Sequence, residues 1–434
     1  MGVTQRTQTI STKLQAIAKK AQSESELIFT SLAHLLDVDF LREAYRRIRK
    51  SGATGVDGVT ADEYAGNLKG NLTDLHERLR SNNYEAPPVK RKLIPKSDGK
   101  LRAIGIITLE DKIVQKAVTM FLEPILEQDF YSFSMGFRPG KSQHQALQII
   151  REACLEINIG WLIDADVSGF FDNMSHHHLR AFTQRRINDG SIMRLIGKWL
   201  NAGVLENGEL SYPEAGTPQG GVISPLLSNI YLHNVLDEWF AEVVQPRLKG
   251  RSFIIRFADD FIIGCELESD ARRIMEVLPK RFERFGLNIH PTKTSLIDFT
   301  KPKRGASNKT DTFTFLGFTH YWAKSRRGFW IIKRKTVGKR LGRSLKALWE
   351  WCRENRHLPL KEQYQKLCQK IRGHIQYYGI IGNYESLKSF VHGASNAWQY
   401  WLSRRSHRSK IPWEIFQKLL DKMPLPKARI IHQL

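Results

Sequence analysis

The sequence predicts an α+β fold with a small antiparallel sheet among many helices, and three observations support this prediction. Trp161–Val167 has the pattern of a buried strand, and the apolar runs Phe253–Ile255 and Phe261–Ile263 have that of two short strands joined by a tight turn that holds two aspartates. Apolar residues recur at helical spacing through most of the remaining chain. The 434 residues are 41% hydrophobic, which is enough for a large core divided over two or three domains.

The N-terminal part is predicted to be mainly helical. The apolar residues of Ser25–Lys50 recur at helical spacing, the glycines of Ser51–Thr60 interrupt that pattern, and Leu68–Leu79 restores an amphipathic helix. Before the first acidic residue, Glu24, the chain is basic and rich in Ser and Thr, which loosely matches an organellar transit peptide. We expect a flexible basic arm there instead.

Residues Val89–Ile106 are expected to form two strands joined at the Asp98-Gly99 turn. The cations of this hairpin are Lys90, Arg91, Lys92, Lys96, Lys100 and Arg102. Such a ribbon can be a solvated edge that resists aggregation, or it can hold a triphosphate on cations that need no reorganisation. Taken alone, the hairpin favours the solvated edge.

Four aspartates form the most informative pattern. Asp164 and Asp166 lie two residues apart on a buried strand, so strand alternation puts both carboxylates on one face, where burial is costly unless they are paired or bind metal. Asp259 and Asp260 occupy a hairpin turn where Asn-Gly or Asp-Gly is usual. Alone, that pair would be a solvated acidic turn. Together, the two groups could hold two metal ions for phosphoryl or nucleotidyl transfer.

The other elements follow in chain order. Helices are expected over Leu109–Phe130, after the loop within Ser134–Leu147, within Gly216–Phe240 behind a glycine-rich loop, and over Ala271–Phe285. A turn and a strand are expected over Gly286–Phe299, and another strand over Phe313–Trp322. The rest of the chain is expected to be mainly helical. Three consecutive histidines, His176 to His178, fit no zinc spacing and indicate an exposed helix start.

The formal net charge of +23 lies almost entirely in the C-terminal part of the chain. Residues 1–300 carry 38 Lys+Arg and 37 Asp+Glu, whereas residues 301–434 carry 29 and 7. Trp and Tyr residues are interleaved with these cations, a combination typical of surfaces that contact phosphates and stack on bases. We therefore expect a polyanionic partner.

Composition also excludes some classes of protein. The four cysteines, Cys154, Cys265, Cys352 and Cys368, have no Cys-x-x-Cys spacing, which argues against a disulfide framework and a zinc ribbon. No apolar run approaches the length of a membrane span. We expect a soluble protein of the bacterial cytoplasm, with import into an organelle left open.

Seven segments, taken together, resemble reverse transcriptases, and specifically the group II intron-encoded reverse transcriptase/maturase family. They are IPKSDGKLRAIGI, GFRPGKSQH, DADVSGFFDN, GTPQGGVISPLLSNIYL, RFADDF, GLNIHPTKT and FLGF. They occur in the family's order and cover about Ser25 to Tyr321, and Gln369–Trp401 is similar to the maturase, or X, segment. Seven motifs in register are hard to obtain by chance.

The resemblance implies a right-hand polymerase fold with fingers, a palm bearing a small antiparallel sheet, and a helical thumb. It divides the chain into residues 1–85, an N-terminal extension and the start of the fingers; 86–320, the reverse transcriptase fingers and palm; and 321–434, a basic helical thumb/maturase region. After Trp401 the chain has neither cysteine pairs nor a His-Asn-His arrangement, so we expect no C-terminal endonuclease domain.

The resemblance also assigns the acidic residues. Asp166, Asp259 and Asp260 are expected to be catalytic, with Asp164 behind them. Two Mg²⁺ ions are expected, held by Asp166, Asp259 and the carbonyl of Val167, for two-metal nucleotidyl transfer.

Other site residues follow from the same motifs. The expected nucleotide-binding residues are Lys96 and Arg102 for the triphosphate, Phe171 against the ribose 2′-hydroxyl, Gln219 at the templating base pair, and Lys293 as proton donor to pyrophosphate. The expected primer grip is Phe315, Leu316, Gly317 and Phe318. In the basic tail, Arg404, Arg405 and Arg408 are expected to bind RNA.

The implied protein is an RNA-dependent DNA polymerase that also binds its intron RNA and assists splicing and mobility. Its expected partners are group II intron RNA, an RNA template with a DNA or RNA primer, target DNA and dNTPs, with no membrane. Two alternatives are a maturase-only splicing cofactor with a vestigial polymerase site and a reverse transcriptase domesticated for repair or defence. The intact aspartates argue against the first, and the intron-like C-terminal segment argues against the second.

Two positions depart from the family pattern. Phe257 stands where the family usually has tyrosine before Ala-Asp-Asp, and Ile107 stands where it commonly has proline. The loss of the tyrosine hydroxyl could alter fidelity or rate, whereas metal binding should be unaffected.

Overall fold

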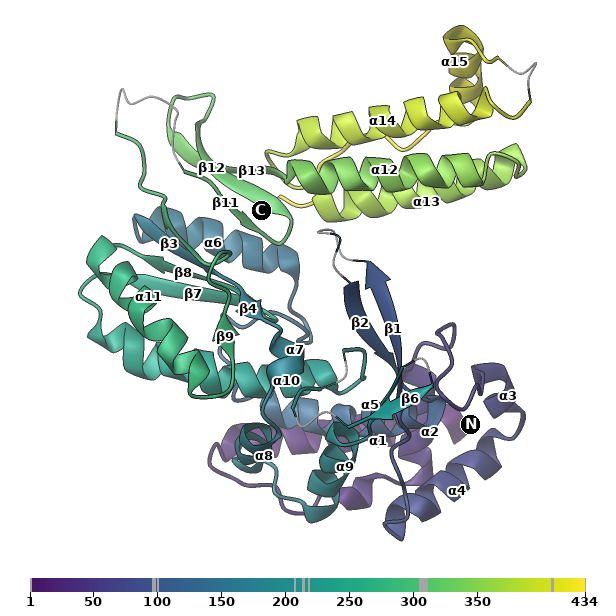
Figure 1. Ribbon diagram of the computed structural model, residues 1–434, viewed down its shortest axis with the longest axis vertical. Coiled ribbons are helices and arrows are strands. Elements are labelled where there is room, and N and C mark those ends of the chain that lie inside the picture. The colour runs from purple at the N-terminus through teal and green to yellow at the C-terminus, as the bar shows by residue number, and fades with distance from the viewer. Residues whose placement is uncertain are drawn as a thin grey trace.

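The computed structural model describes residues 2–95, 99, 101–206, 208–212, 215–217, 219–303, 311–406 and 410–433, with backbone only for residues 2–9. Within these ranges the chain is a mixture of helices and small, mainly antiparallel sheets, which confirms the α+β class (Figure 1). No helix in the described part of the chain has the length and apolar character that a membrane span needs.

The N-terminal part is a layer of helices: α1 (Gly2–Ser23), α2 (Val38–Arg47), α3 (Ala61–Gly66), α4 (Leu68–Arg80) and α5 (Leu109–Leu126). The prediction of a flexible arm was wrong, because α1 packs on α5 and buries Ile10 and Ala21, with Leu14 and Ile17 partly buried between them. These four residues recur at helical spacing and so form one apolar stripe. The helix predicted over Ser25–Lys50 was partly wrong, since Phe29 bridges to Ile187 as extended chain.

A four-stranded sheet, in the order β2-β1-β5-β6, stands on this helical layer. Its strands are β1 (Val89–Pro95), β2 (Leu101–Ile106), β5 (Val204–Glu206) and β6 (Glu209–Ser211). The predicted basic hairpin is confirmed, with β1 and β2 paired from Lys90↔Ile106 to Pro95↔Leu101. Figure 1 shows both strands rising from the N-terminal helices in the direction of the C-terminal helices.

The central sheet has the order β10-β3-β8-β7 and is antiparallel throughout. Its strands are β3 (Trp161–Ala165), β7 (Ser252–Phe257), β8 (Asp260–Cys265) and β10 (Ser295–Asp298). Ile163 and Ile263 face the core that includes α11 (Glu268–Glu283), whereas Leu162 and Ile262 face a second core that includes α6 (Gln143–Glu156). Helices therefore cover both faces of the sheet.

The predicted strand Trp161–Val167 is interrupted at Asp166. Beyond the break, β4 (Val167–Ser168) pairs with β9 (Asn288–Ile289) in a separate two-stranded sheet. Three short helices then follow: α7 (Phe170–Asn173), α8 (His176–Gln184) and α9 (Gly190–Leu200). The histidines do begin α8, as predicted.

Helix α10 (Ser224–Leu232) continues into π-helical turns at His233–Asp237 and Trp239–Val244, and the segment closes with a 3₁₀ turn at Gln245–Arg247. Another 3₁₀ turn, Ala33–Leu35, precedes α2. π-Helical turns inside α-helices are rare and occur often at functional sites. Here they bring Asp237 under the central sheet, where it meets Arg256 of β7.

The C-terminal part consists of a three-stranded sheet and a helical layer. Its elements are β11 (Phe313–Phe315), β12 (Phe318–Lys324), β13 (Trp330–Thr336), α12 (Gly338–Glu354), α13 (Leu360–Tyr378), α14 (Tyr384–Leu402) and α15 (Trp413–Lys422). The single strand predicted over Phe313–Trp322 is instead a hairpin, because Leu316 and Gly317 form a turn with φ of 48° and 84°. Strand β13 was not predicted.

Asp189 links the N-terminal segment to α9. Its buried carboxylate accepts four backbone N–H bonds, from Leu32 at 2.6 Å, Ala33 at 2.9 Å, Ser191 at 2.9 Å and Ile192 at 3.1 Å. Burial of the carboxylate raises its pKa, but the four donors outweigh burial and leave the pKa below its ordinary value.

We predict that Asp189→Ala lowers the free energy of unfolding by about 2 kcal/mol, because it removes a helix cap and leaves buried N–H groups unpaired. Because the folded pKa is lowered, the carboxylate stabilises the fold at neutral pH and this contribution is lost as the pH falls through the folded pKa. The difference in the free energy of unfolding between wild type and Asp189→Asn, measured by urea unfolding, should therefore become smaller as the pH is lowered. Asp62→Ala, at an exposed site in α3, is the control, and a gap that is independent of pH would contradict the prediction.

Candidate active site

The turn that joins β7 and β8 is the centre of the candidate site. Phe257 pairs with Asp260, so Ala258 and Asp259 form a two-residue connection. Ala258 has a φ of 59°, at a turn position that usually favours glycine. The backbone of Gly136 approaches this turn so closely that a Cβ on Gly136 would lie 2.1 Å from the Ala258 nitrogen. The surrounding chain therefore fixes a strained turn.

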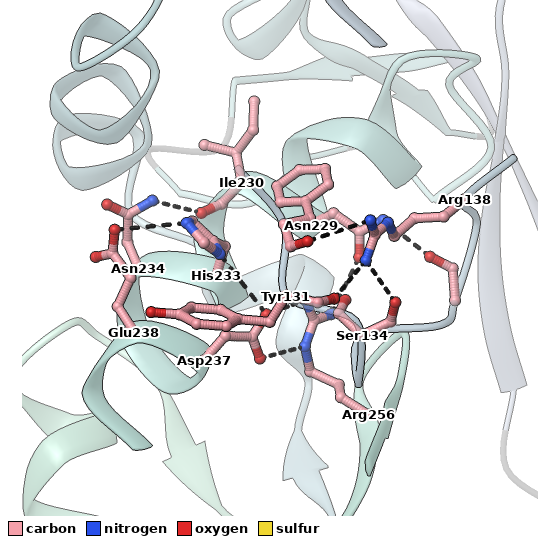
Figure 2. A network of polar contacts seen from close by, with 12 residues as sticks. Tyr131, Ser134, Arg138, Asn229, Ile230, His233, Asn234, Asp237, Glu238 and Arg256 are labelled. Carbon is pink, nitrogen blue, oxygen red and sulfur yellow. Dashed lines mark hydrogen bonds and ion pairs between the residues drawn. The ribbon is translucent and has the colours of Figure 1, made fainter. Parts of the chain in front are cut away.

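Beneath the turn lies Arg256, whose side chain is fully buried against Asp237 (Figure 2). Its Nε donates to Asp237 Oδ1 at 2.8 Å, and its Nη2 donates to the other carboxylate oxygen and to Ser134 Oγ at 2.6 Å. Its Nη1 donates at 3.0 Å to both Asn229 Oδ1 and the carbonyl of Ala258. All five N–H groups thus have acceptors, and one of these acceptors belongs to the strained turn itself.

A second buried arginine orders the chain that contacts this turn. Arg138 binds Glu127 through Nε and Nη2 at 3.0 Å each and donates through Nη1 to the carbonyls of Tyr131 and Ser134. The Gly136 carbonyl accepts from Asn229 Nδ2 at 2.9 Å. In the sequence, Arg138 is one arginine of the GFRPGKSQH segment, and nothing in the local pattern indicates this role.

Asp166 lies where β3 ends, beside the turn of the neighbouring strand. Ala165 pairs with Phe261, so the next residue of each strand, Asp166 and Asp260, continues toward the same edge. The loop after β9 holds Asp166 on three sides. The Asp166 carbonyl accepts from His290 N at 2.7 Å, the Asp166 N–H donates to Thr294 Oγ1 at 3.4 Å, and the Asp166 carboxylate accepts from Lys293 Nζ at 2.7 Å.

The carboxylates of this edge are close enough to perturb one another. Burial raises the pKa of Asp164 to about 7, with further contributions from the charges of Asp260 and Asp166. Asp260 retains solvent exposure, yet the surrounding protein and the charges of Asp259 and Asp166 raise its pKa to about 6. Burial, and then the charge of Asp166, also raise the pKa of Asp259. The structure therefore brings together all four aspartates that the sequence singled out.

Three cations from different parts of the chain reach this acidic edge. The positive charge of Arg102 on β2 lowers the pKa of Asp259, and the charges of Lys293 and Arg340 lower the pKa of Asp260, although burial and the neighbouring carboxylates keep both pKa values raised. Arg340 lies in the first turn of α12 and was not singled out from the sequence, where one arginine in a basic helix carries no distinguishing signal. Lys96, the other expected triphosphate ligand, lies outside the described residues.

The donor set fits a hard divalent cation. Within the described ranges, no three His, Cys, Asp or Glu side chains are arranged to hold a metal ion by themselves. Mg²⁺ is usually bound by one or two carboxylates together with water and substrate phosphates. Asp166 and Asp259 supply such carboxylates, and mutual repulsion at this edge favours a bound cation.

A cavity of about 240 Å³ adjoins the site. Phe171 on α7 and Gln219 both line it, together with Gly105, Gly203 and Gly216. The Gln219 carbonyl accepts from Gly105 N at 2.6 Å, and a Cβ on Gly220 would lie 2.3 Å from the Gly105 carbonyl oxygen. The glycine-rich loop thus packs directly against β2, which only a residue without a side chain allows.

The FLGF motif forms the tip of the β11–β12 hairpin. Phe315 and Phe318 are buried in the core, so their rings are not available to a ligand. The Leu316 carbonyl accepts from Tyr377 Oη at 2.8 Å. Any contact with a primer is therefore confined to the Leu316–Gly317 turn, and the primer-grip role stays a prediction.

The tail arginines differ in their surroundings. The Arg404 guanidinium lies 3.5 Å from the centroid of the Tyr400 ring, as in a cation–π pair. Arg405 donates to the carbonyl of Leu358 at 2.7 Å and is partly structural. Arg408 lies outside the described residues. The expected RNA contacts of these arginines also stay a prediction.

Comparison with known proteins gives several matches. Residues 94–320 match the family described as "Reverse transcriptase (RNA-dependent DNA polymerase)". Protein YkfC of Escherichia coli (strain K12) is 40% identical over 358 residues, covering 74% of this chain and 90% of YkfC. Group II intron-encoded protein LtrA of Lactococcus lactis subsp. cremoris is 35% identical over 270 residues, covering 62% of this chain and 44% of LtrA. Nuclear intron maturase 2, mitochondrial, of Arabidopsis thaliana is 28% identical over 193 residues, 34% of this chain and 26% of that protein.

We predict that Arg256→Met lowers the free energy of unfolding by about 3–5 kcal/mol, because it leaves the Asp237 carboxylate buried without its partner. The double variant Arg256→Met/Asp237→Leu should recover most of that loss, since it removes both charges together. Urea unfolding followed by tryptophan fluorescence measures both. If the double variant were as unstable as the single variant, the pair could not be the interaction that supports this turn.

Proposed function

Because the chain belongs to the group II intron reverse transcriptase/maturase family, we propose that it is an RNA-directed DNA polymerase that also binds intron RNA as a maturase. One observation carries the polymerase assignment: Asp166, Asp259 and Asp260 converge at one edge of the central sheet, beside a cavity lined by Phe171 and Gln219. The substrates are an RNA template, a DNA or RNA primer and dNTPs.

The acidic edge prepares the site for nucleotidyl transfer. Two Mg²⁺ ions, when bound by Asp166, Asp259 and the Val167 carbonyl, supply activation of the primer 3′-hydroxyl and charge neutralisation at the leaving pyrophosphate. The Lys293 ammonium pairs with Asp166 and so places a positive charge at the acidic edge. It is the group that donates a proton to the leaving pyrophosphate. The strained Ala258 turn orients Asp259 without reorganisation during the reaction.

The nucleotide is held from the opposite side of the site. Arg102 and Lys96 bind the triphosphate. For Arg102 this role is supported by its charge, which is near enough to Asp259 to lower the pKa of that carboxylate. Phe171 lies in the cavity wall, where its ring collides with a ribose 2′-hydroxyl and favours deoxynucleotides. Gln219 and the adjacent glycines contact the templating base pair through the backbone.

The layout is that of a right hand. Residues 1–85 form the N-terminal extension and the start of the fingers, 86–320 the fingers and palm, and 321–434 the thumb/maturase region. Two features support this division: the basic β1–β2 hairpin rises from the N-terminal helices, and α12, α13 and α14 form a separate layer beyond it (Figure 1). Intron RNA binds chiefly to the basic residues 321–434, and target DNA engages the same protein during intron mobility.

We predict that Asp259→Ala lowers the rate of cDNA synthesis on a primed RNA template about 10³-fold, because it removes one of two carboxylate ligands. The assay measures dNTP incorporation with Mg²⁺. Asp298→Ala is the matched control, since Asp298 lies in β10 of the same sheet, opposite Trp161 and away from the site. Wild-type rates in Asp259→Ala would contradict the proposal, as would an inactive wild-type enzyme that only assisted splicing.

A separate prediction concerns the tail. Arg404→Ala should weaken intron RNA binding and reduce the slope of log K against log salt by about 0.7, the expected change when one phosphate of a single strand is no longer neutralised. Arg404 is preferable to Arg405, because its bond to the Tyr400 carbonyl is long, at 3.4 Å, whereas Arg405 donates to the Leu358 carbonyl at 2.7 Å. Arg272→Ala, on exposed α11, is the control. An unchanged salt slope would remove Arg404 from the RNA interface.

A further inference from the structure

A groove of about 880 Å³ lies between α8 and α9, separate from the catalytic edge. Helix α8 contributes His177 and Arg180, and helix α9 contributes Arg194 and Lys198. Tyr212, which is 66% exposed, also lines the groove. Figure 1 places these helices on the side of the molecule away from β11 and β12.

The groove is electropositive. Among the described residues that line it, Glu85 is the one carboxylate. Within the described part of the chain, neither Arg180 nor Arg194 makes an ion pair with a carboxylate; the neighbouring Arg185 and Arg186, by contrast, pair with Glu238 and Asp129. Lys198 donates to the backbone carbonyls of Asn82 and Tyr84 and, within the described residues, makes no ion pair with a carboxylate. Cations without acidic partners along one groove are what a polyanion requires.

Two glycines make room for side chains of this groove. A Cβ on Gly197, inside α9, would lie 2.6 Å from an Nη atom of Arg180, so the guanidinium rests on the helix backbone. A Cβ on Gly203 would lie 2.9 Å from the Tyr212 ring. Both a cation and an aromatic ring are thus positioned across the groove by a neighbouring glycine.

The groove begins where the cavity of the active site ends. Trp199, Gly203 and Ser211 line the active-site cavity, while their chain neighbours Lys198, Ala202 and Tyr212 line the groove. If the chain is the polymerase proposed above, the primer ends at the catalytic edge, and its duplex with the template extends toward the expected primer grip at the Leu316–Gly317 turn. On the other side of the new base pair, only unpaired template continues.

We propose that the α8–α9 groove binds the single-stranded RNA template ahead of the base being copied. The cations of Arg180, Arg194 and Lys198 contact its phosphates, and Tyr212 stacks on one of its bases. This inference rests on the proposed polymerase function and adds to it the path of the template.

The test compares two primed RNA templates that differ only in the 5′ overhang, a single nucleotide in one and about ten nucleotides in the other, the length of a typical single-strand site. For Arg180→Ala/Arg194→Ala, the Kd of the long-overhang substrate should rise about tenfold, and its salt slope should fall by about 0.7 for each phosphate that is no longer neutralised. The short-overhang substrate should bind as in wild type. Arg272→Ala/Arg273→Ala removes the same charge from exposed positions of α11 and is the control.

Two further variants test positioning separately from charge. Gly197→Ala retains every charge but displaces Arg180, so it should also weaken the long-overhang substrate selectively. Tyr212→Ala should do the same by about tenfold, whereas Tyr212→Phe should retain binding because the stacking ring remains. Equal effects on both substrates, or none on either, in Arg180→Ala/Arg194→Ala would overturn the groove proposal. A wild-type protein that extends neither substrate would instead overturn the proposed polymerase function.

Discussion

The buried ion pair between Arg256 and Asp237 is the constraint on which the active-site edge depends. A guanidinium and a carboxylate without solvent are stable together only when every donor and acceptor is matched, and here all five N–H groups of Arg256 have acceptors. The acceptors lie on α10 and the π-helical turn that continues it, on the loop before α6 and on the β7–β8 turn. One side chain therefore determines how three segments distant in sequence meet beneath Asp259.

Above this pair, several carboxylates lie close together, and the positive charge beside them does not balance theirs. Asp164, Asp259 and Asp260 all have raised pKa values. Besides Arg256 itself, the cations that lower the pKa of Asp259 or Asp260 come from β2, the loop after β9 and α12. The acidic edge is thus the point at which the N-terminal, central and C-terminal parts of the chain interact electrostatically. An ion or a nucleotide bound there would link the same three parts.

The strongly basic C-terminal region divides its aromatic residues between two roles. Trp322 and Trp398 are 3% and 0% exposed and belong to the core that joins this region to the central sheet. Trp349 and Trp413 are 36% and 46% exposed, and Arg404 stacks on Tyr400 beside Trp349. Composition alone does not tell which of these rings belong to the core and which to the surface. Their separation follows from helix packing, which buries one face of α14 and leaves the other to solvent.

The sequence alone determined the α+β class, the strands on either side of the acidic turn, and the four aspartates that the structure brings together, because period-two and helical patterns and short motifs are local properties of the chain. It failed for α1 and for the β11–β12 hairpin, where an amphipathic stripe of low hydrophobicity and a two-residue turn gave weak local signals. Only the tertiary structure decided that Arg256 supports the Ala258 turn, that Arg340 reaches Asp260, and that Gly197 and Gly203 make room for Arg180 and Tyr212. Each of these three features depends on an interaction between atoms that are remote in the chain. The energy of such an interaction is set by distance and burial, and residue type alone specifies neither.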